Sequence, residues 1–271
     1  MNGPDQPSTA RIRDYWLGGS HNTNADRDLA EQILVCAPHL PYSIRTQRAF
    51  LRRVVRYLVM SGIRQFVDLG SGTPTVGNVH EIAQALDPAC RVVYVDIDPV
   101  VVAEGRHLLA SNDHVVYLRA DLRRPDEILA AAEVRALLSL GEPVAVLIVD
   151  VLHFVRDSDD PGGLISGYLD ALSPGSCLGV SDMGNDDGML AAMTMFSRMF
   201  DSPLPTLTFR DRDRIAEFFG GLDIVDPGVV PVPLWRPDGD DPETDRNPEQ
   251  FQGYAAVVRK PYHPATSVTG R

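Results

Sequence analysis

One segment of the chain, residues 65–73, reads Gln65-Phe66-Val67-Asp68-Leu69-Gly70-Ser71-Gly72-Thr73. Its apolar start is typical of a strand buried in a parallel sheet, and an acid followed by two glycines predicts a sharp turn where that strand ends. Because glycine has no side chain, a ligand can approach the backbone of this turn closely. The segment therefore predicts an α/β fold with a binding site at the carboxyl end of its first strand.

A second buried strand is expected over residues 91–96, and it ends in Asp96. An acid at this place in a nucleotide-binding sheet holds a ribose, because a carboxylate accepts hydrogen bonds from two adjacent hydroxyls. The turn and Asp96 together predict a nucleoside-bearing cofactor.

The turn favours S-adenosylmethionine over a dinucleotide. A dinucleotide turn has a third glycine that lets pyrophosphate sit on a helix N-terminus, and here Thr75 occupies that position. The next helix begins only near Asn78, where Asn78 and Glu81 match a capping box. Asp68, beneath the turn, would repel phosphates and attract an ammonium or sulfonium group. An NAD-dependent oxidoreductase remains the alternative.

Composition limits the classes of function. The 271 residues, 44% of them hydrophobic, can bury one α/β core with an extension. A net charge of −12 argues against a nucleic-acid partner. The three cysteines lack C-x-x-C spacing, so we expect free thiols and no zinc or other metal site. No apolar run reaches transmembrane length, and the expected location is cytoplasmic, away from membranes.

Strands and helices alternate through most of the chain. Strands are expected at the glycine turn and over residues 91–96, 115–119, 144–149, 177–181, 224–232 and 254–258. Helices are expected over residues 26–35, 44–60, 78–86, 99–110, 125–139, 163–172, 188–200 and 211–219. Such alternation predicts a parallel sheet with helices on both faces, and the last two strands form an antiparallel hairpin at one edge. This is the seven-stranded, Rossmann-like plan of class I methyltransferases.

Three parts are expected along the chain: an N-terminal helical extension or lid (residues 1–60), a cofactor-binding domain (residues 61–262) and a disordered tail (residues 263–271). The helix over residues 44–60 carries several arginines away from its apolar face. We interpret them as a solvated face, with an anionic partner as the alternative. They are Arg45, Arg48, Arg52, Arg53 and Arg56.

Ligands of open parallel sheets bind beyond the carboxyl ends of the strands. With the turn and its helix cap, this rule selects as cofactor-binding candidates Asp68, Gly70, Ser71, Gly72, Asn78, Asp96, Ile97, Asp98, Asp121, Leu122, Asp150 and Val151. Asp121 would meet the adenine amino group and Leu122 would offer a backbone N–H, unless Asp121 caps the helix that starts near Pro125.

Methyl transfer from a sulfonium requires an in-line approach of the nucleophile, and it requires a base only where the nucleophile carries a proton. Asp150 and His153 follow the fourth strand, and His153 is the candidate base. The alternative is a hydrogen-bonded structural histidine. Asp182, after the fifth strand, is a second catalytic candidate.

The sequence resembles an actinobacterial S-adenosyl methyltransferase family of undefined substrate. The matching motifs span residues 10–260 and include Ala10-Arg11 through Gly18-Gly19 and Asn22, residues 62–72, Gly77-Asn78-Val79-His80-Glu81, residues 92–96 and Val151-Leu152-His153-Phe154. The chain departs from the family pattern at Arg13, where an aromatic is usual, at Asp150, where a small residue is usual, and at Asp182, near a position often occupied by histidine.

The resemblance implies that residues 11–22 fold over the cofactor pocket, with Gly18, Gly19 and Asn22 beside it. As a lid, this segment would turn Arg11 and Tyr15 toward the cofactor carboxylate. The alternative is that its aromatic residues pack a helix onto the sheet edge. We therefore expect a methyltransferase that uses S-adenosylmethionine on a small-molecule acceptor. The alternative from another class is a regulatory or scaffold protein that binds S-adenosylmethionine or S-adenosylhomocysteine without turnover.

Overall fold

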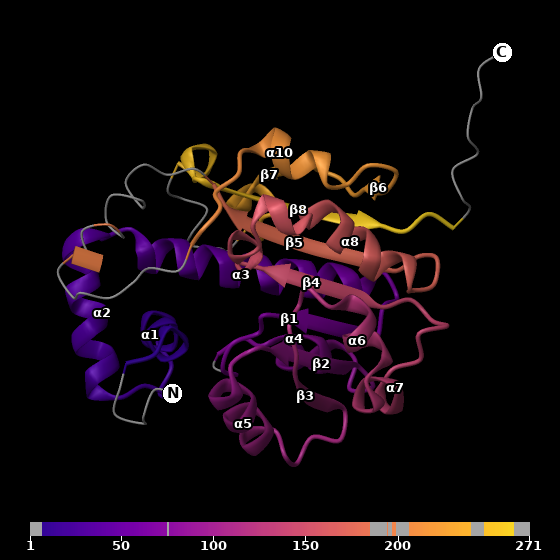
Figure 1. Cartoon of the computed structure of the whole chain (residues 1–271), viewed down its shortest axis with the longest axis horizontal. Helices are drawn as coiled ribbons and strands as arrows, with labels where there is room; N and C mark the ends of the chain where they lie inside the picture. Colours follow the sequence, from indigo (N-terminus) through magenta and orange to yellow (C-terminus); the bar gives the residue numbers. More distant parts are fainter. Residues whose placement is uncertain are drawn as a thin grey trace.

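The chain forms a mixed β-sheet with helices on both faces (Figure 1). The structure, a computed structural model, describes residues 7–74, 76–184, 194, 197–198, 206–239 and 247–262. The strands are β1 (Gln65–Leu69), β2 (Arg91–Asp96), β3 (Val115–Arg119), β4 (Ala145–Val149), β5 (Cys177–Met183), β6 (Asp223–Ile224), β7 (Val230–Pro231) and β8 (Gly253–Arg259). Their order in the sheet is β3-β2-β1-β4-β5-β8-β6, and β7 also pairs with β8.

The sheet confirms the predicted topology, with one correction at its edge. Strands β1 to β5 pair in parallel, and β8 runs antiparallel to β5, β6 and β7. The single strand predicted over residues 224–232 is wrong, because that segment forms the two short strands β6 and β7. Pro227, which has no N–H to donate, and Gly228, which adopts a positive φ of 90°, interrupt it.

Two apolar layers enclose the sheet. Helices α3 (Leu40–Met60), α4 (Val79–Leu86) and α5 (Pro99–Leu108) supply one layer, and α6 (Pro125–Ala130), α7 (Ala132–Leu137), α8 (Pro161–Asp170) and α10 (Arg212–Glu217) supply the other. The helix predicted over residues 125–139 is broken, because Ala131 takes an extended ψ of 138° between α6 and α7. The helix predicted over residues 188–200 and the tail from residue 263 lie outside the described residues, apart from Thr194, Ser197 and Arg198.

Helix α3 does not expose all its arginines, which corrects part of the sequence interpretation. Arg53 is 4% exposed, and its guanidinium donates to the carbonyl oxygens of Trp235 (2.9 Å) and Val232 (2.8 Å). Arg48 donates to the carbonyl oxygen of Gly77 at 3.1 Å. Both guanidinium groups therefore bind backbone of neighbouring segments.

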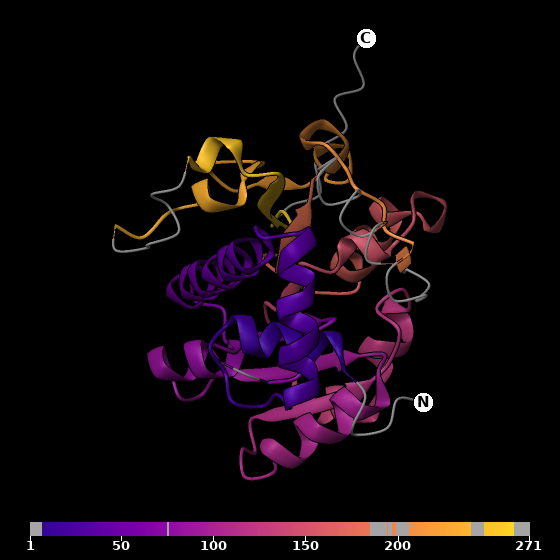
Figure 2. The same ribbon diagram turned by 90° about the vertical axis from the view of Figure 1, so that its left-hand side faces the viewer.

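Helices α1 (Thr9–Trp16) and α2 (Asn24–Cys36) lie at the sheet edge where β4 and β5 end, on the left in Figure 1 and toward the viewer in Figure 2. This is the edge at which ligands of parallel sheets bind. None of the helices in the described ranges is long and apolar enough to cross a membrane.

Candidate functional site

The glycine turn at the end of β1 has the backbone that its sequence predicts. Gly70 and Gly72 take φ values of 69° and 65°, a region that L-residues with side chains rarely adopt. A Cβ at Gly70 would lie 2.5 Å from a Val151 methyl carbon, whereas a Cβ at Gly72 would meet no atom within 4 Å. Val151 therefore packs directly on the turn, and Gly72 borders open space.

Asp96 braces the turn from the end of β2. One carboxylate oxygen accepts from the Gly72 N–H at 2.9 Å, and the other accepts from the Asp98 N–H at 2.9 Å. Asp98 in turn caps α5 through the N–H of Val100. Because each oxygen of Asp96 has more than one acceptor position, both can also bind hydroxyl groups. Ile97, next to Asp96, is 61% exposed and offers an apolar surface beside the same carboxylate.

Two stacked tyrosines support the turn from below, a feature that the sequence analysis missed. The rings of Tyr94 and Tyr117 stack at 4.8 Å, and the Tyr117 hydroxyl donates to the carbonyl oxygen of Gly72 at 3.2 Å. The Tyr94 hydroxyl accepts from the His80 N–H at 2.9 Å and thereby joins the turn to α4. Asn78 caps α4 in a capping box with Glu81, as predicted.

Asp68 lies beneath the turn and is 7% exposed. Burial raises the pKa of its carboxyl to about 7, with the nearby Arg48 charge opposing the shift and Asp96 adding to it. A carboxylate that is costly to ionise in the protein alone would be stabilised by a cation in the adjacent space.

At the end of β4, Asp150 connects the sheet to α1. It has a φ of 57°, which is unusual for a residue other than glycine, and its N–H donates to the Ser181 carbonyl oxygen at 3.1 Å. One carboxylate oxygen accepts from the Arg13 guanidinium. The other is buried without a hydrogen-bond partner among the described residues, and such an atom marks a place where a ligand donor would fit.

His153 and Asp182 are brought together in a buried network. The His153 Nδ1 lies 3.2 Å from one Asp182 oxygen, and Arg210 donates to the other at 3.1 Å. His153 is 4% exposed and Asp182 is fully buried. The arrangement fixes the imidazole ring, which is compatible with both the base and the structural role considered above.

The two candidates for adenine binding, Asp121 and Leu122, have different hydrogen-bond partners. The Asp121 carboxylate is engaged by Arg123, whose Nη2 donates to it at 2.6 Å, and this hydrogen bonding lowers the Asp121 pKa. Arg124, not Asp121, occupies the N-cap of α6, so the helix-cap alternative for Asp121 is wrong. The Leu122 carbonyl oxygen accepts from the Tyr168 hydroxyl at 2.7 Å.

The predicted lid residues Arg11 and Tyr15 form hydrogen bonds to residues of α2. The Arg11 Nε donates to Asp26 at 2.7 Å; burial would raise the Asp26 pKa, but hydrogen bonds from Arg11, Thr23 and Ser8 lower it to about 2. The Tyr15 hydroxyl donates to Glu31 at 2.8 Å. Their predicted contact with a cofactor stays a prediction.

The Gly18-Gly19 turn is tied to buried Asp14. Gly18 has a φ of 77°, and a Cβ at Gly19 would lie 1.8 Å from an Asp14 oxygen. Asn22 donates to the other Asp14 oxygen at 2.6 Å and to the Gly19 carbonyl oxygen at 3.0 Å. These contacts give the glycines and Asn22 a structural role in shaping the segment, whether or not it also covers a ligand.

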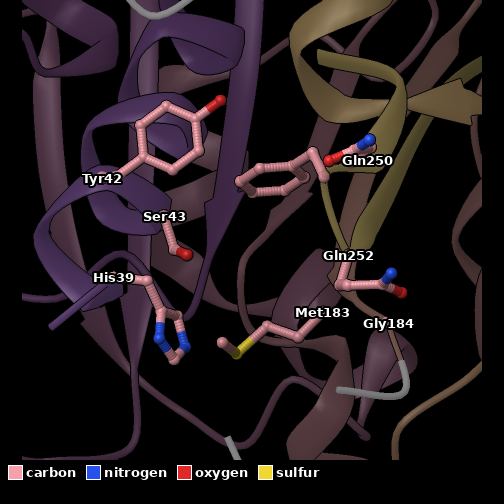
Figure 3. A pocket seen from close by; sticks show the side chains of 8 residues that line it. His39, Tyr42, Ser43, Met183, Gly184, Gln250 and Gln252 are labelled. Carbon is pink, nitrogen blue, oxygen red and sulfur yellow. The ribbon is translucent and has the colours of Figure 1, made fainter. Parts of the chain in front are cut away.

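A pocket of about 150 Å³ lies near the end of β5, between that strand and the start of α3. Figure 3 shows His39, Tyr42 and Ser43 on one wall, with Met183 opposite. The sequence analysis missed this pocket, because its walls come from segments far apart in the chain and carry no local motif.

Comparisons with known proteins agree with the geometry. A sequence model described as S-adenosyl methyltransferase matches residues 3–261. The crystal structure of a DUF574 family protein from Streptomyces avermitilis is 37% identical, with a TM-score of 0.83 over 95% of this chain and 98% of that one. A candidate methyltransferase from Thermobifida fusca is 38% identical, with a TM-score of 0.82 over 95% and 96% of the two chains. No curated protein is detectably similar to the chain.

Proposed function

Because the chain belongs to the S-adenosyl methyltransferase family, we propose that it transfers a methyl group from S-adenosylmethionine to a small-molecule acceptor. The observation that carries this proposal is the glycine turn at β1 braced by Asp96 at β2. The two ends of neighbouring parallel strands thus present open backbone and a carboxylate side by side, as a nucleoside with an amino-acid tail requires.

The residues at these strand ends fit the cofactor. Asp96 would hold the ribose hydroxyls, because each of its oxygens can accept a further hydrogen bond beyond the one from the backbone. The open space at Gly72 would take the amino-acid tail, and buried Asp68 would pair with its ammonium group. Exposed Ile97 offers apolar contact to a flat base. Asp121 and Leu122 remain the candidates for adenine.

When bound, S-adenosylmethionine supplies a methyl group on a positively charged sulfur, which leaves as a neutral thioether. The chain's own residues then have to position the acceptor in line, exclude water and, for a protonated nucleophile, take up a proton. We assign proton uptake to His153, whose ring is oriented by Asp182. Asp150, with its unpartnered buried oxygen, would bind a hydrogen-bond donor of the cofactor or acceptor.

Helix α1 would cover the bound cofactor. Arg13 joins this helix to the strand ends by its bond to Asp150, while the Nε of Arg11 bonds to Asp26. The lid predicted from the sequence is therefore proposed to close through Arg13.

Thermal unfolding with added ligands tests the proposal. S-adenosylhomocysteine at 100 times its Kd should raise the stability by about 2.7 kcal/mol, and NAD should leave the melting temperature unchanged. Incubation with labelled S-adenosylmethionine and a metabolite extract should then transfer label to a small molecule. Stabilisation by NAD and not by S-adenosylhomocysteine would refute the proposal. Tight S-adenosylhomocysteine binding without transfer to any acceptor would favour the regulatory alternative.

A further inference from the structure

None of the residues that line the pocket near the end of β5 has been assigned a role so far. Hydrogen bonds of neighbouring residues link this pocket to the proposed cofactor site. Ser43, in the pocket wall, is followed one helical turn later by Gln47 and Arg48. Gln47 accepts from the Ser181 hydroxyl at 2.5 Å, and Arg48 donates to Gly77 in the loop after the glycine turn. One turn of α3 thus leads from the pocket to Ser181 of β5 and to the loop between β1 and α4.

The far wall of the pocket is joined to the same strand end. Met183 is the last residue of β5 and directly follows Asp182. Gly184 donates to the Gln252 carbonyl oxygen at 3.2 Å, which holds the segment before β8 against this end of the strand. The pocket therefore lies at the same edge of the sheet as Asp150, whose N–H bonds to the Ser181 carbonyl oxygen.

The side chains in the pocket walls favour an uncharged aromatic ring as the ligand. Tyr42 and Phe251 meet edge to face with their centres 5.7 Å apart, and Met183 adds a polarisable thioether. Edge-to-face aromatic groups and methionine favour aromatic partners. Among the described residues, the polar groups of the walls are the hydroxyls of Tyr42 and Ser43, the His39 imidazole and the glutamine amides, and none of these wall residues is Asp, Glu, Lys or Arg.

The size of the pocket agrees with a single ring. Its volume is about 150 Å³. An apolar protein cavity of about this volume accommodates one benzene molecule. A larger acceptor would have to extend from the pocket toward the strand ends, which is the direction of the reacting methyl group under the proposed function.

We propose that this pocket binds the ring of an uncharged aromatic acceptor whose hydroxyl group is methylated. The inference rests on the proposed function and specifies its substrate class. An alkylamine would be cationic at neutral pH and a carboxylic acid anionic, and no Asp, Glu, Lys or Arg among the described residues of the walls would pair with either charge. In the reaction, a lone pair of the hydroxyl oxygen forms the new bond to the methyl carbon. The bond from that carbon to sulfur breaks with its electron pair remaining on sulfur, and the hydroxyl proton passes to His153.

Ligand-observed NMR on the full chain saturated with S-adenosylhomocysteine tests this assignment. The probes are phenol, benzoate and benzylamine, which share one ring and differ in charge. The variant Ser43→Leu fills the pocket and suits a helix at least as well as serine, so it should fold. Ser111→Leu makes the same substitution at an exposed position outside the pocket and is the matched control.

We expect phenol to bind the wild type and Ser111→Leu equally and Ser43→Leu at least tenfold more weakly, with both charged probes at least tenfold weaker than phenol. Phe251→Ala, which removes an aromatic side chain from the pocket wall, should also weaken phenol binding. It replaces Ser43→Leu in the test if that variant does not fold. Normal S-adenosylhomocysteine binding without phenol binding, or with phenol binding unaffected by both pocket variants, would overturn this inference alone. Failure to bind S-adenosylhomocysteine would overturn the proposed function and this inference with it.

Discussion

The variant Asp68→Asn should make the free protein more stable and its cofactor binding weaker. Asp68 is 7% exposed beneath the glycine turn, and burial raises its pKa from the ordinary value of 3.8 to about 7. The folded protein therefore resists ionisation of this carboxyl, whereas the unfolded chain ionises it freely. Asparagine has nearly the same shape and no charge, so it removes this cost.

The size and sign of the effect follow from proton linkage. Between pH 4 and pH 7 the folded state holds a proton on Asp68 that the unfolded state has lost, so stability falls as the pH rises. The cost is absent below the unfolded pKa and complete above about pH 7. At about 1.4 kcal/mol for each pH unit between the two pKa values, Asp68→Asn should stabilise the protein by about 4 kcal/mol at pH 8 and by almost nothing near pH 4.

Urea unfolding at several pH values between 4.5 and 8 measures this difference directly. The gap in unfolding free energy between variant and wild type should widen as the pH rises, while the control Asp113→Asn, at an exposed turn, should follow the wild type throughout. Calorimetry should show weaker S-adenosylhomocysteine binding to Asp68→Asn, because the ligand ammonium group loses its buried anion. A gap that does not change with pH, or a variant that is less stable at pH 8, would contradict the reasoning.

Three further experiments test the other strand ends and their contact with α1. Asp96→Ala should weaken S-adenosylhomocysteine binding by about 1.5 to 3 kcal/mol, the contribution of hydrogen bonds to a charged group, and an unchanged Kd by calorimetry would place the ribose elsewhere. His153→Asn should keep that Kd within about twofold and lower kcat by about 10²-fold, and a normal kcat would assign His153 the structural role. Arg13→Ala and Asp150→Asn should couple by about 0.5 to 3 kcal/mol in a double-mutant cycle of unfolding free energies, and additive effects would show that the bridge does not contribute.

The features that could be predicted from the sequence are those that short segments encode. The turn from Asp68 to Gly72 combines strand, acid and glycines within a few residues, and the capping box of Asn78 and Glu81 lies within one helical turn. Asp96 was identified because the strand order of such sheets places the end of its strand beside the turn. In each case the physical cause is local, or it follows from one general rule of topology.

The features that were missed depend on contacts between distant parts of the chain. The apolar ring of Tyr117 suited a buried strand, and nothing nearby indicated that its hydroxyl would bond to Gly72. Arg53 was interpreted as solvated because arginine is seldom buried, yet carbonyl oxygens some 180 positions later satisfy it. Helical periodicity continued through Ala131, where the backbone instead turns. Contacts between segments far apart in the sequence determine the structure at these positions.

Arg13 and Asp150 show how such a distant contact bears on function. The sequence analysis expects both to depart from the family pattern, and in the structure they bond to each other across 137 positions of sequence. The segment around Arg13 is also held by hydrogen bonds of Arg11 with Asp26 and of Asn22 with Asp14. This arginine and this acid bring charge and hydrogen-bonding capacity to the end of β4, next to Val151, which packs on the glycine turn. Under the proposed function, the reacting groups would meet there.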